Sequence, residues 1–421
     1  MRSLLAAGAV LLGLTGAGGA IAQPVHPATV VGTPADISEG QRFTLHSTVL
    51  DEDRVVSVST PPSYGRDSQR RYPVLYLTDG QFNFDDARAS AGFLSRNVMV
   101  PQMIVVGITT IKDRTRDLYS TKANFKFGKK TIPFPTSGNG DHFLQFIQSE
   151  LVPWVEQNYR TDSLRLFAGH SAGGNFALHA MRTRPMLFQG VIAISPWLSW
   201  DDHRELHELQ SSLATAKTPV RALFFSYTDP IHDGPEMKGD IDALSAALRR
   251  RNDPALRWAM ATYPGETHDM TFVKGFYDGL RMIFAGYDSP RDPETNTLVG
   301  SLDDIKVRYA KVGEGLGVVL PPPIEVLDEL GYRDLRQGKP DGALTAFRFE
   351  IEQYPQSPGA WDSLADGLEG AGKPDEALVA RRKAEMVAEA NHDPAVGSYR
   401  RRTQQLVDRI KAAAERKATA P

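Results

Sequence analysis

Apolar and polar positions fall into two kinds of segment along the first two thirds of this chain. Residues 43–49 and 55–60 alternate between apolar and polar side chains, which predicts strands with one exposed face. Later segments are continuously apolar, which is typical of strands covered on both faces of a parallel sheet. These apolar runs fall at 72–77, 103–108, 164–168, 190–194, 222–227 and 258–263.

Segments with helical spacing separate these runs and set the expected fold class. Residues 141–158, 239–251 and 272–284 carry this pattern. Strands and helices in alternation predict an open, mostly parallel α/β sheet with helices on both faces. We expect this fold to occupy residues 23–290.

The pattern changes after Tyr287, where a purely helical tail is expected. Residues 291–320 are predicted to form a linker, and residues 321–421 a small all-α domain. Residues 338–344 recur almost unchanged at 372–378, 34 residues later, and this is the period of tetratricopeptide repeats. Two repeats are fewer than usually stand alone, which favours a stabilising appendage. A groove for a protein partner, or self-association through the tail, is the alternative.

The first 22 residues have the features of a signal peptide. A positive start at Arg2 precedes an apolar run at 4–14, and Ala20 and Ala22 form an A-x-A cleavage signal before Gln23. A membrane anchor or a buried helix is the alternative, but the apolar run is short for a bilayer. We therefore expect the mature protein to be periplasmic or secreted and not associated with a membrane.

Composition narrows the chemistry further. The chain has no cysteine, which excludes disulfides, a thiolate metal site and a lipid-modified N-terminal cysteine. The 48 basic and 51 acidic residues give a formal net charge of −3. The basic residues form no stripe, so nucleic acid is not expected as a partner. No metal or cofactor is predicted.

The most informative motif is a G-x-S-x-G pattern made by Gly169, Ser171 and Gly173. It lies between the predicted strand at 164–168 and a run of helix-forming residues at 175–181. In this context the pattern predicts a nucleophile elbow, a strained turn that exposes the serine hydroxyl at the edge of a sheet. We predict Ser171 to be a nucleophile.

A serine hydroxyl needs a positioned base, and the chain order in this kind of fold is serine, acid, histidine. His268 follows the last predicted strand, in a loop that precedes a helix. We predict His268 to be the general base, although a solvated loop histidine is the alternative. His170, next to the serine, is predicted to be structural or to line a pocket.

The acid is expected in the loop after the strand at 222–227, which holds three carboxylates. Asp229 is closest to the strand end and is the first choice, Glu236 the second and Asp233 the third. The acid would hold the imidazole in one tautomer and stabilise the imidazolium.

Acyl transfer also requires N–H donors directed at the developing oxyanion. One donor is expected to be the backbone N–H of Ala172, directly after the nucleophile. The second is expected after the strand at 72–77, from Gly80 or Gln81, although Asp79 and Gly80 can also form an ordinary turn.

Together these segments resemble a known family. The matching pieces are the elbow and residues 72–81, 114–118, 143–147, 150–155 and 195–200. Over about residues 40–287 the chain resembles α/β-hydrolase esterases of the group that includes enterochelin (siderophore) esterases and related carboxylesterases. The combination of the esterase segment with a helical tail also resembles a variant of this group that carries tetratricopeptide repeats.

The resemblance implies ester hydrolysis by Ser171 and His268, with Trp197 near the substrate pocket. Arg114 and Arg116 lie in one matching piece. They could grip an anionic or catecholate substrate, or form an ion-pair cluster that fixes a loop.

We expect an exported serine hydrolase that cleaves a small-molecule carboxylic ester through an acyl-enzyme. A siderophore esterase of the enterochelin type is the narrower alternative. An inactive hydrolase fold that binds a partner through its helical repeats is the alternative of another class.

Overall fold

The computed structural model describes residues 39–127, 130–215 and 220–419. The predicted signal peptide at 1–22 lies outside the described residues. Glu39–Pro421 form one compact unit, so the helical tail is not a separate unit from the sheet. Among the described residues, no helix combines the length and the apolar character that a membrane span requires.

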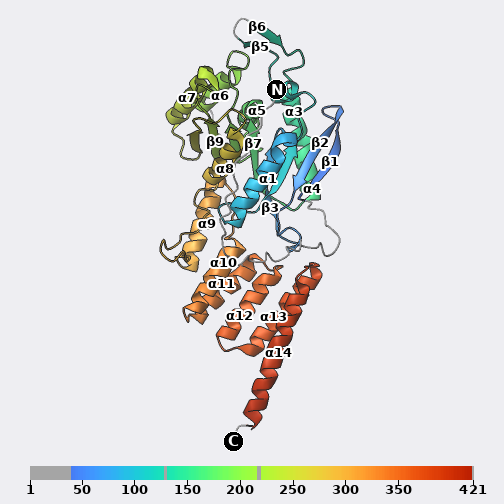
Figure 1. The fold of residues 1–421 in the computed structure, drawn as a ribbon, viewed down its shortest axis with the longest axis vertical. Helices are drawn as coiled ribbons and strands as arrows, with labels where there is room; N and C mark the ends of the chain where they lie inside the picture. The colour runs from blue at the N-terminus through green and yellow to red at the C-terminus, as the bar shows by residue number, and fades with distance from the viewer. Residues whose placement is uncertain (1–38, 128–129, 216–219, 420–421) are drawn as a thin grey trace, which may run out of the picture. The chain divides into compact units, whose positions relative to one another are not determined.

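The centre of this unit is an eight-stranded sheet with the order β1-β2-β4-β3-β7-β8-β9-β10 (Figure 1). Strands β1 and β2 pair antiparallel, as do β2 and β4, and the other pairs are parallel. The strands are β1 (Gln41–Ser47), β2 (Glu52–Ser59), β3 (Tyr72–Leu77), β4 (Ile104–Ile108), β7 (Thr161–His170), β8 (Gly190–Ile194), β9 (Ala222–Tyr227) and β10 (Arg257–Thr262).

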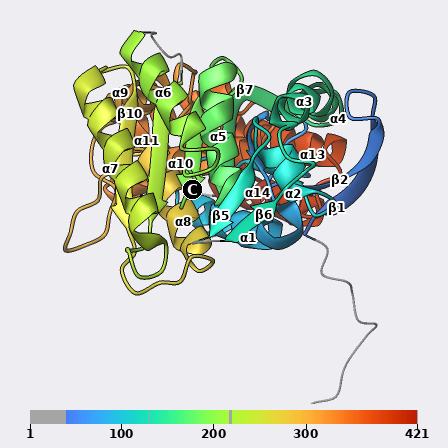
Figure 2. The same ribbon diagram turned by 90° about the horizontal axis from the view of Figure 1, so that it is seen from above.

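The continuous apolar runs are explained by burial on both faces of the sheet. Successive side chains of a strand point to opposite faces, and in β3 Val74 and Tyr76 join one core while Leu75 and Leu77 join the other. Figure 2 shows α5 and α6 on one side and α1 and α8 on the other. The predicted α/β sheet with two helical layers is confirmed.

The helices of this part cover the sheet and connect its strands. They are α1 (Gly80–Arg96), α2 (Arg114–Leu118), α3 (Gly140–Phe146), α4 (Val152–Asn158), α5 (Ala172–Thr183), α6 (Arg204–Thr215), α7 (Gly234–Arg251) and α8 (Thr271–Ile283). A π-helical segment, η1 (Ile147–Leu151), joins α3 to α4, so the helix predicted at 141–158 has an interruption. A hairpin of β5 (Asn124–Phe127) and β6 (Lys130–Pro133) is present that the sequence analysis does not predict.

A helix occupies half of the segment predicted as a linker. Helix α9 (Leu302–Leu316) begins at a capping box in which Ser301 and Asp304 bond to each other's backbone N–H groups. The linker prediction at 291–320 is wrong here, because apolar residues at helical spacing bury one face of the segment. Those residues share a core with α1 and α8: Ile305, Tyr309, Val312 and Leu316.

Five further helices form the tail and lie side by side in chain order (Figure 1). They are α10 (Ile324–Arg336), α11 (Pro340–Gln353), α12 (Pro358–Gly370), α13 (Pro374–Ala390) and α14 (Val396–Thr419). The two copies of the sequence repeat adopt the same turn: Lys339 has φ −110° and ψ 67°, and Lys373 has φ −113° and ψ 64°. The assignment of these helices to tetratricopeptide repeats stays a prediction.

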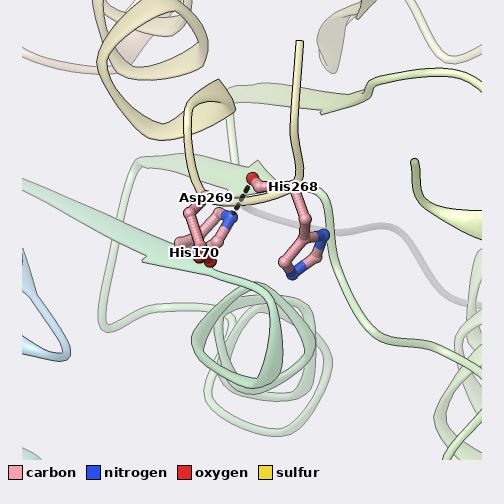
Figure 3. Close-up of side chains that lie close together, drawn as sticks. All are labelled: His170, His268 and Asp269. Atoms are coloured by element: carbon pink, nitrogen blue, oxygen red, sulfur yellow. Dashed lines mark hydrogen bonds between the residues drawn. The ribbon is translucent and has the colours of Figure 1, made fainter.

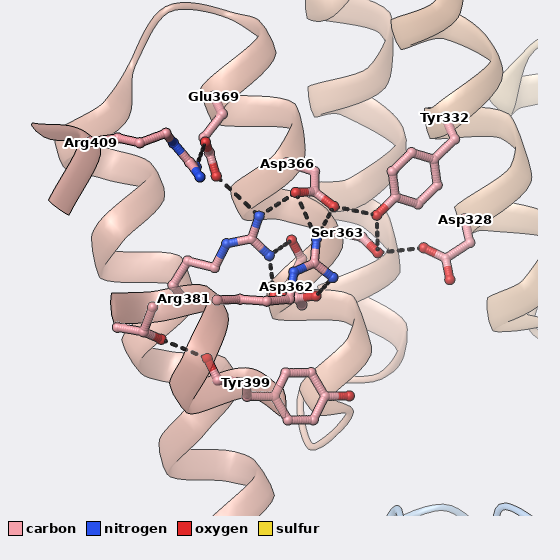
Figure 4. A network of polar contacts seen from close by, with 11 residues as sticks. Asp328, Tyr332, Asp362, Ser363, Asp366, Glu369, Arg381, Tyr399 and Arg409 are labelled. Atoms are coloured by element: carbon pink, nitrogen blue, oxygen red, sulfur yellow. Dashed lines mark hydrogen bonds and ion pairs between the residues drawn. The ribbon is translucent and has the colours of Figure 1, made fainter. Parts of the chain in front are cut away.

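The tail is held together by a network of ion pairs (Figure 4). Arg381 is buried and bonds Asp362, Asp366 and Glu369 on α12. Arg402 of α14 bonds Asp362 and Asp366 as well. Because the carboxylate partners of both guanidinium groups lie on α12, these ion pairs fix α13 and α14 to α12.

Candidate active site

Ser171 lies at a sharp turn between β7 and α5. Its backbone has φ 60° and ψ −118°, a region that a residue with a side chain rarely adopts. A Cβ on Gly169 would lie 2.0 Å from the carbonyl oxygen of Gly173, and one on Gly173 would lie 2.3 Å from Oγ1 of Thr78. Both positions therefore require glycine, and the turn has the geometry of a nucleophile elbow.

Neighbouring segments hold this turn in place. The N–H of Ser171 donates to the carbonyl of Ile194 over 2.9 Å, and the N–H of Trp197 donates to the carbonyl of Ser171 over 3.1 Å. The side chain of Asn175 donates to the carbonyl of Trp197 over 2.9 Å. The serine is thus fixed at the carboxyl edge of the sheet, where parallel α/β folds place their ligand sites.

His268 lies in the loop between β10 and α8, and its partner is Asp233. The ring Nδ1 lies 2.6 Å from Oδ1 of Asp233, whose side chain is fully buried. Asp233 also accepts from the N–H of Thr228 at 2.7 Å and from the hydroxyl of Ser195 at 3.2 Å.

Burial alone would raise the pKa of Asp233, but the hydrogen bonds from His268 and Thr228 hold it below its ordinary value. The ionised carboxylate therefore accepts the proton on Nδ1. In the neutral ring, Nε2 then carries the lone pair.

Asp229, the first choice for the acid, does not contact His268. Its Oδ1 accepts from the N–H groups of Ile231 and His232 at 2.9 and 3.1 Å, and its Oδ2 accepts from the N–H of Gly265 at 2.8 Å. The bond from Gly265 is the largest cause that lowers the pKa of Asp229 to about 2.

These bonds turn the chain after β9 and use the Asp229 carboxylate to fix the loop. The turn brings Asp233, at the start of α7, to His268 instead. Glu236, the second choice, is exposed on the first turn of the same helix. The structure therefore contradicts Asp229 as the partner of His268, and the carboxylate that bonds His268 is that of Asp233, the third choice.

Ser171 and His268 line one hollow of about 490 Å³. The ring Nε2 of His268 has no hydrogen-bond partner among the described residues. Ser171 and His268 thus border the same cavity, and Nε2 of His268 is a buried atom without a hydrogen-bond partner among the described residues. The other lining residues are Asp79, Phe82, Asn83, Arg114, His170 and Asp269.

Two helix N-termini lie beside the serine and carry the predicted oxyanion donors. Ala172 is the first residue of α5 and Gly80 the first of α1. Backbone N–H groups in the first turn of a helix lack intrahelical acceptors and can serve an anion. The side chain of Gln81 is turned away, because its Oε1 accepts from the N–H of Thr110 at 3.1 Å.

Arg114 is both paired and open to the hollow. Its Nε and Nη2 donate to the two carboxylate oxygens of Asp79 over 2.8 and 3.0 Å. Its Nη2 also donates to the carbonyl of His170 over 3.0 Å. These bonds hold the guanidinium at the cavity wall. More than a third of the Arg114 side chain is nevertheless exposed, so it remains accessible from the hollow.

Arg116 belongs to an ion-pair cluster and not to the hollow. It bonds Glu52 and the fully buried Asp117, and Arg54 bonds the same two carboxylates. Burial would raise the pKa of Glu52, but its hydrogen bond with Arg116 and the other cations nearby lower it to about 2. The loop-fixing interpretation therefore holds for Arg116.

His170 and Trp197 flank His268. The ring of His170 is buried and its Nε2 lies 2.9 Å from the carbonyl oxygen of His268 (Figure 3). Burial, with the nearby His268, lowers the pKa of His170 to about 4, so this ring is neutral at ordinary pH. Trp197 packs edge-on against His268 at 6.4 Å, and the lining of the hollow does not include it among the described residues.

The comparisons with known proteins agree with this geometry. The model of the Esterase family matches residues 47–254. This match covers just under half of the chain, and over these residues the chain is similar to the esterase family. The elbow and most strands of the sheet lie within the matched segment. The predicted α/β-hydrolase fold is confirmed.

Two curated relatives of the esterase segment are siderophore esterases by name. The chain is 27% identical over 225 residues to ferri-bacillibactin esterase BesA of Bacillus subtilis (strain 168), covering 50% of this chain and 76% of BesA. It is 30% identical over 196 residues to the siderophore triacetylfusarinine C esterase of Aspergillus fumigatus, covering 44% of this chain and 65% of that enzyme.

A solved structure extends the likeness. An IroE-like serine hydrolase from Shewanella oneidensis superposes with a TM-score of 0.65 and 26% identity, covering 75% of this chain and 99% of that one. Together the family match and these relatives identify the esterase chain as a carboxylic ester hydrolase.

Several cavity residues are absent from the sequence predictions. Asp79, Phe82, Asn83 and Asp269 line the hollow without having been predicted to do so. A signal for the first three was available, because they directly follow a buried strand whose carboxyl end meets the elbow. Asp269 adjoins His268 in the sequence.

Proposed function

We propose that this esterase works through a Ser171–His268–Asp233 triad. The observation that carries the proposal is the division of roles between the two nitrogens of His268. Nδ1 is bound to a buried carboxylate, while Nε2 has no partner among the described residues and shares a cavity with the serine. A base prepared for proton transfer needs this arrangement.

In the proposed reaction, the hydroxyl oxygen of Ser171 attacks the ester carbonyl and its proton moves to Nε2 of His268. The N–H groups of Ala172 and of Gly80 or Gln81 bind the oxyanion. The C–O bond then breaks, and the alcohol leaves with the proton from Nε2. Water, activated by the same nitrogen, hydrolyses the acyl-enzyme and releases the acid. This chemistry uses no metal or cofactor.

We further propose a siderophore ester as the substrate class. The support is that two relatives are siderophore esterases by name, together with Arg114 at the cavity wall. A ferric catecholate is anionic, and a rigid guanidinium suits an anion. The exposed ring of Phe82 lines the same hollow and offers a surface for an aromatic group.

The substrate proposal is tested by comparing the hydrolysis of three esters. Purified protein is given a ferric catecholate trilactone, the iron-free trilactone and p-nitrophenyl acetate, and kcat/KM is measured for each. A kcat/KM at least about tenfold higher for a trilactone than for the acetate supports the proposal. Equal values, or a preference for the acetate, would reject the siderophore class and leave a general esterase.

We also propose that the protein is exported to the periplasm or the medium, on the support of the leading segment alone. Expression in a Gram-negative host, cell fractionation and mass spectrometry of the N-terminus test this. A mature protein that begins at Gln23 and is found outside the cytoplasm is expected. A cytoplasmic protein that retains its leading segment contradicts export.

A further inference from the structure

Three side chains that can ligate a metal gather at the rim of the hollow. They are His170 at the end of β7, and His268 and Asp269 in the loop before α8. Each offers one ligand atom, and these atoms all lie within 4.8 Å of one another. Figure 3 shows the three side chains next to one another.

Both imidazoles are held in the way that metal-binding histidines usually are. Such a histidine donates one ring N–H to a carboxylate or a carbonyl and presents its other nitrogen to the metal. His268 uses Nδ1 toward Asp233, and His170 uses Nε2 toward the carbonyl of His268. The nitrogen left over on His268, Nε2, has no hydrogen-bond partner among the described residues.

The ligand types and distances suit a small, borderline-soft cation. Two imidazoles and a carboxylate form a common set of three protein ligands for Zn²⁺, with bonds of about 2.0–2.2 Å and a fourth position for water. Ligand atoms around such an ion lie about 3.5 Å apart. The upper bound of 4.8 Å exceeds this spacing by about 1 Å, and Asp269 is the exposed member of the three.

The local charge also favours a cation. Arg114 is the positive group on the cavity wall, and Asp79 pairs with it through both carboxylate oxygens. Asp269 at the rim and Asp233 behind His268 add two further carboxylates. The four groups together carry a negative net charge when all are ionised.

We propose that a zinc-class divalent cation binds reversibly to His170, His268 and Asp269 and inhibits the esterase. The inhibition rests on the proposed function, because Nε2 of His268 would be the nitrogen that takes the proton of Ser171. A metal on that lone pair prevents proton transfer, so occupancy by metal and catalysis exclude each other. The esterase would then be active only where free zinc is low.

The test measures binding and inhibition separately on the full chain. Zinc binding is followed by calorimetry, and hydrolysis of p-nitrophenyl acetate is followed with increasing zinc and after addition of a chelator. Asp269→Asn removes one ligand, and each variant's activity is normalised to its own rate without zinc. Glu266→Gln is the matched control, because Glu266 lies in the same loop and pairs with Lys274.

We expect zinc to inhibit the wild type, with activity restored by the chelator. Asp269→Asn should raise both the dissociation constant and the half-inhibitory concentration at least about tenfold, and Glu266→Gln should leave both within about twofold. Ser171→Ala should bind zinc as the wild type does, which tests the site even if the esterase mechanism is wrong. Absence of binding, binding without inhibition, or an Asp269→Asn variant with unchanged affinity would overturn the inference.

Discussion

Oδ1 of Asp233 lies 2.6 Å from Nδ1 of His268, while the carboxylate of Asp229 bonds three backbone N–H groups of its own loop and its neighbour. Asp233 and Asp229 lie only four residues apart in the sequence, yet their carboxylates have different partners. Asp233 bonds the imidazole of His268, and Asp229 bonds backbone N–H groups that fix the loop.

Asp233→Asn is expected to reduce kcat for p-nitrophenyl acetate by about 10³–10⁴-fold, because the amide favours the wrong tautomer of His268. Asp229→Asn is the matched control and should reduce kcat by less than about tenfold, since it loosens the loop but leaves the triad. Steady-state kinetics on both variants decides the assignment. A larger loss in the Asp229 variant would return the role of the acid to Asp229.

Arg114→Lys tests the cavity wall. Lysine keeps the charge but cannot contact both oxygens of Asp79 while also bonding the carbonyl of His170. For a ferric catecholate ester, KM should rise about tenfold, and for p-nitrophenyl acetate it should change by less than about threefold.

Arg116→Lys is the control for that experiment, since Arg116 pairs with Glu52 and Asp117 away from the hollow. It should lower the melting temperature without a change in the ratio of the two KM values. If Arg116→Lys shifts this ratio as much as Arg114→Lys does, the change in KM does not come from a contact between Arg114 and the substrate.

His179 links α5, which carries the elbow, to two acidic residues. Burial would lower the pKa of His179, but hydrogen bonds to Asp141 and Glu205 raise it to about 9. A histidine with a raised pKa contributes stability that is complete below pH 6.5 and is lost as the pH rises through 9. The free energy of unfolding should therefore fall by about 3 kcal/mol over this interval through His179 alone.

His179→Gln should remove that dependence. Urea unfolding at pH 6.5 and pH 9 gives the change for each protein, and the wild type should lose more stability than the variant. Equal losses in the two proteins would show that His179 is not charged in the folded state.

Glu350 is a buried carboxyl in the tail. Burial, with the neighbouring Asp328 and a hydrogen bond to it, raises its pKa above the ordinary 4.5. A carboxyl with a raised pKa favours the folded state when protonated, so its stabilising effect is lost as the pH rises above 4.5.

Glu350→Gln should accordingly stabilise the protein at pH 8 by about 1–3 kcal/mol, because the amide donates without needing a proton. The gain should shrink toward pH 5. Glu352→Gln, at an exposed position of the same helix, should change stability by less than about 0.5 kcal/mol. A Glu350→Gln variant that is less stable at pH 8 contradicts this account.

Much of the sheet could be predicted from the sequence, because strands covered on both faces leave continuous apolar runs. The elbow could be predicted as well, since the contacts around Gly169 and Gly173 allow no side chain there. The choice between Asp229 and Asp233 could not, because it depends on which carboxylate the loop consumes for its own N–H groups. That outcome is a property of the folded turn.

Other misses have different causes. The sequence of helix α9 did contain a helical signal, in the apolar spacing of Ile305, Tyr309 and Leu316 and in the Ser301–Asp304 capping box. The polar segment that precedes the helix led instead to the prediction of a linker. The position of Arg114 at the cavity depends on a pairing with Asp79, which is 35 residues away in the chain. Local patterns do not specify such contacts.

The proposed triad requires an unusually reactive hydroxyl on Ser171, and covalent labelling measures that reactivity. The protein is treated with a fluorophosphonate probe, and the adduct is located by mass spectrometry of the digested chain. We expect one adduct, on Ser171, which is absent in Ser171→Ala and forms much more slowly in His268→Asn. Labelling at another residue, or labelling that persists unchanged in Ser171→Ala, would contradict it.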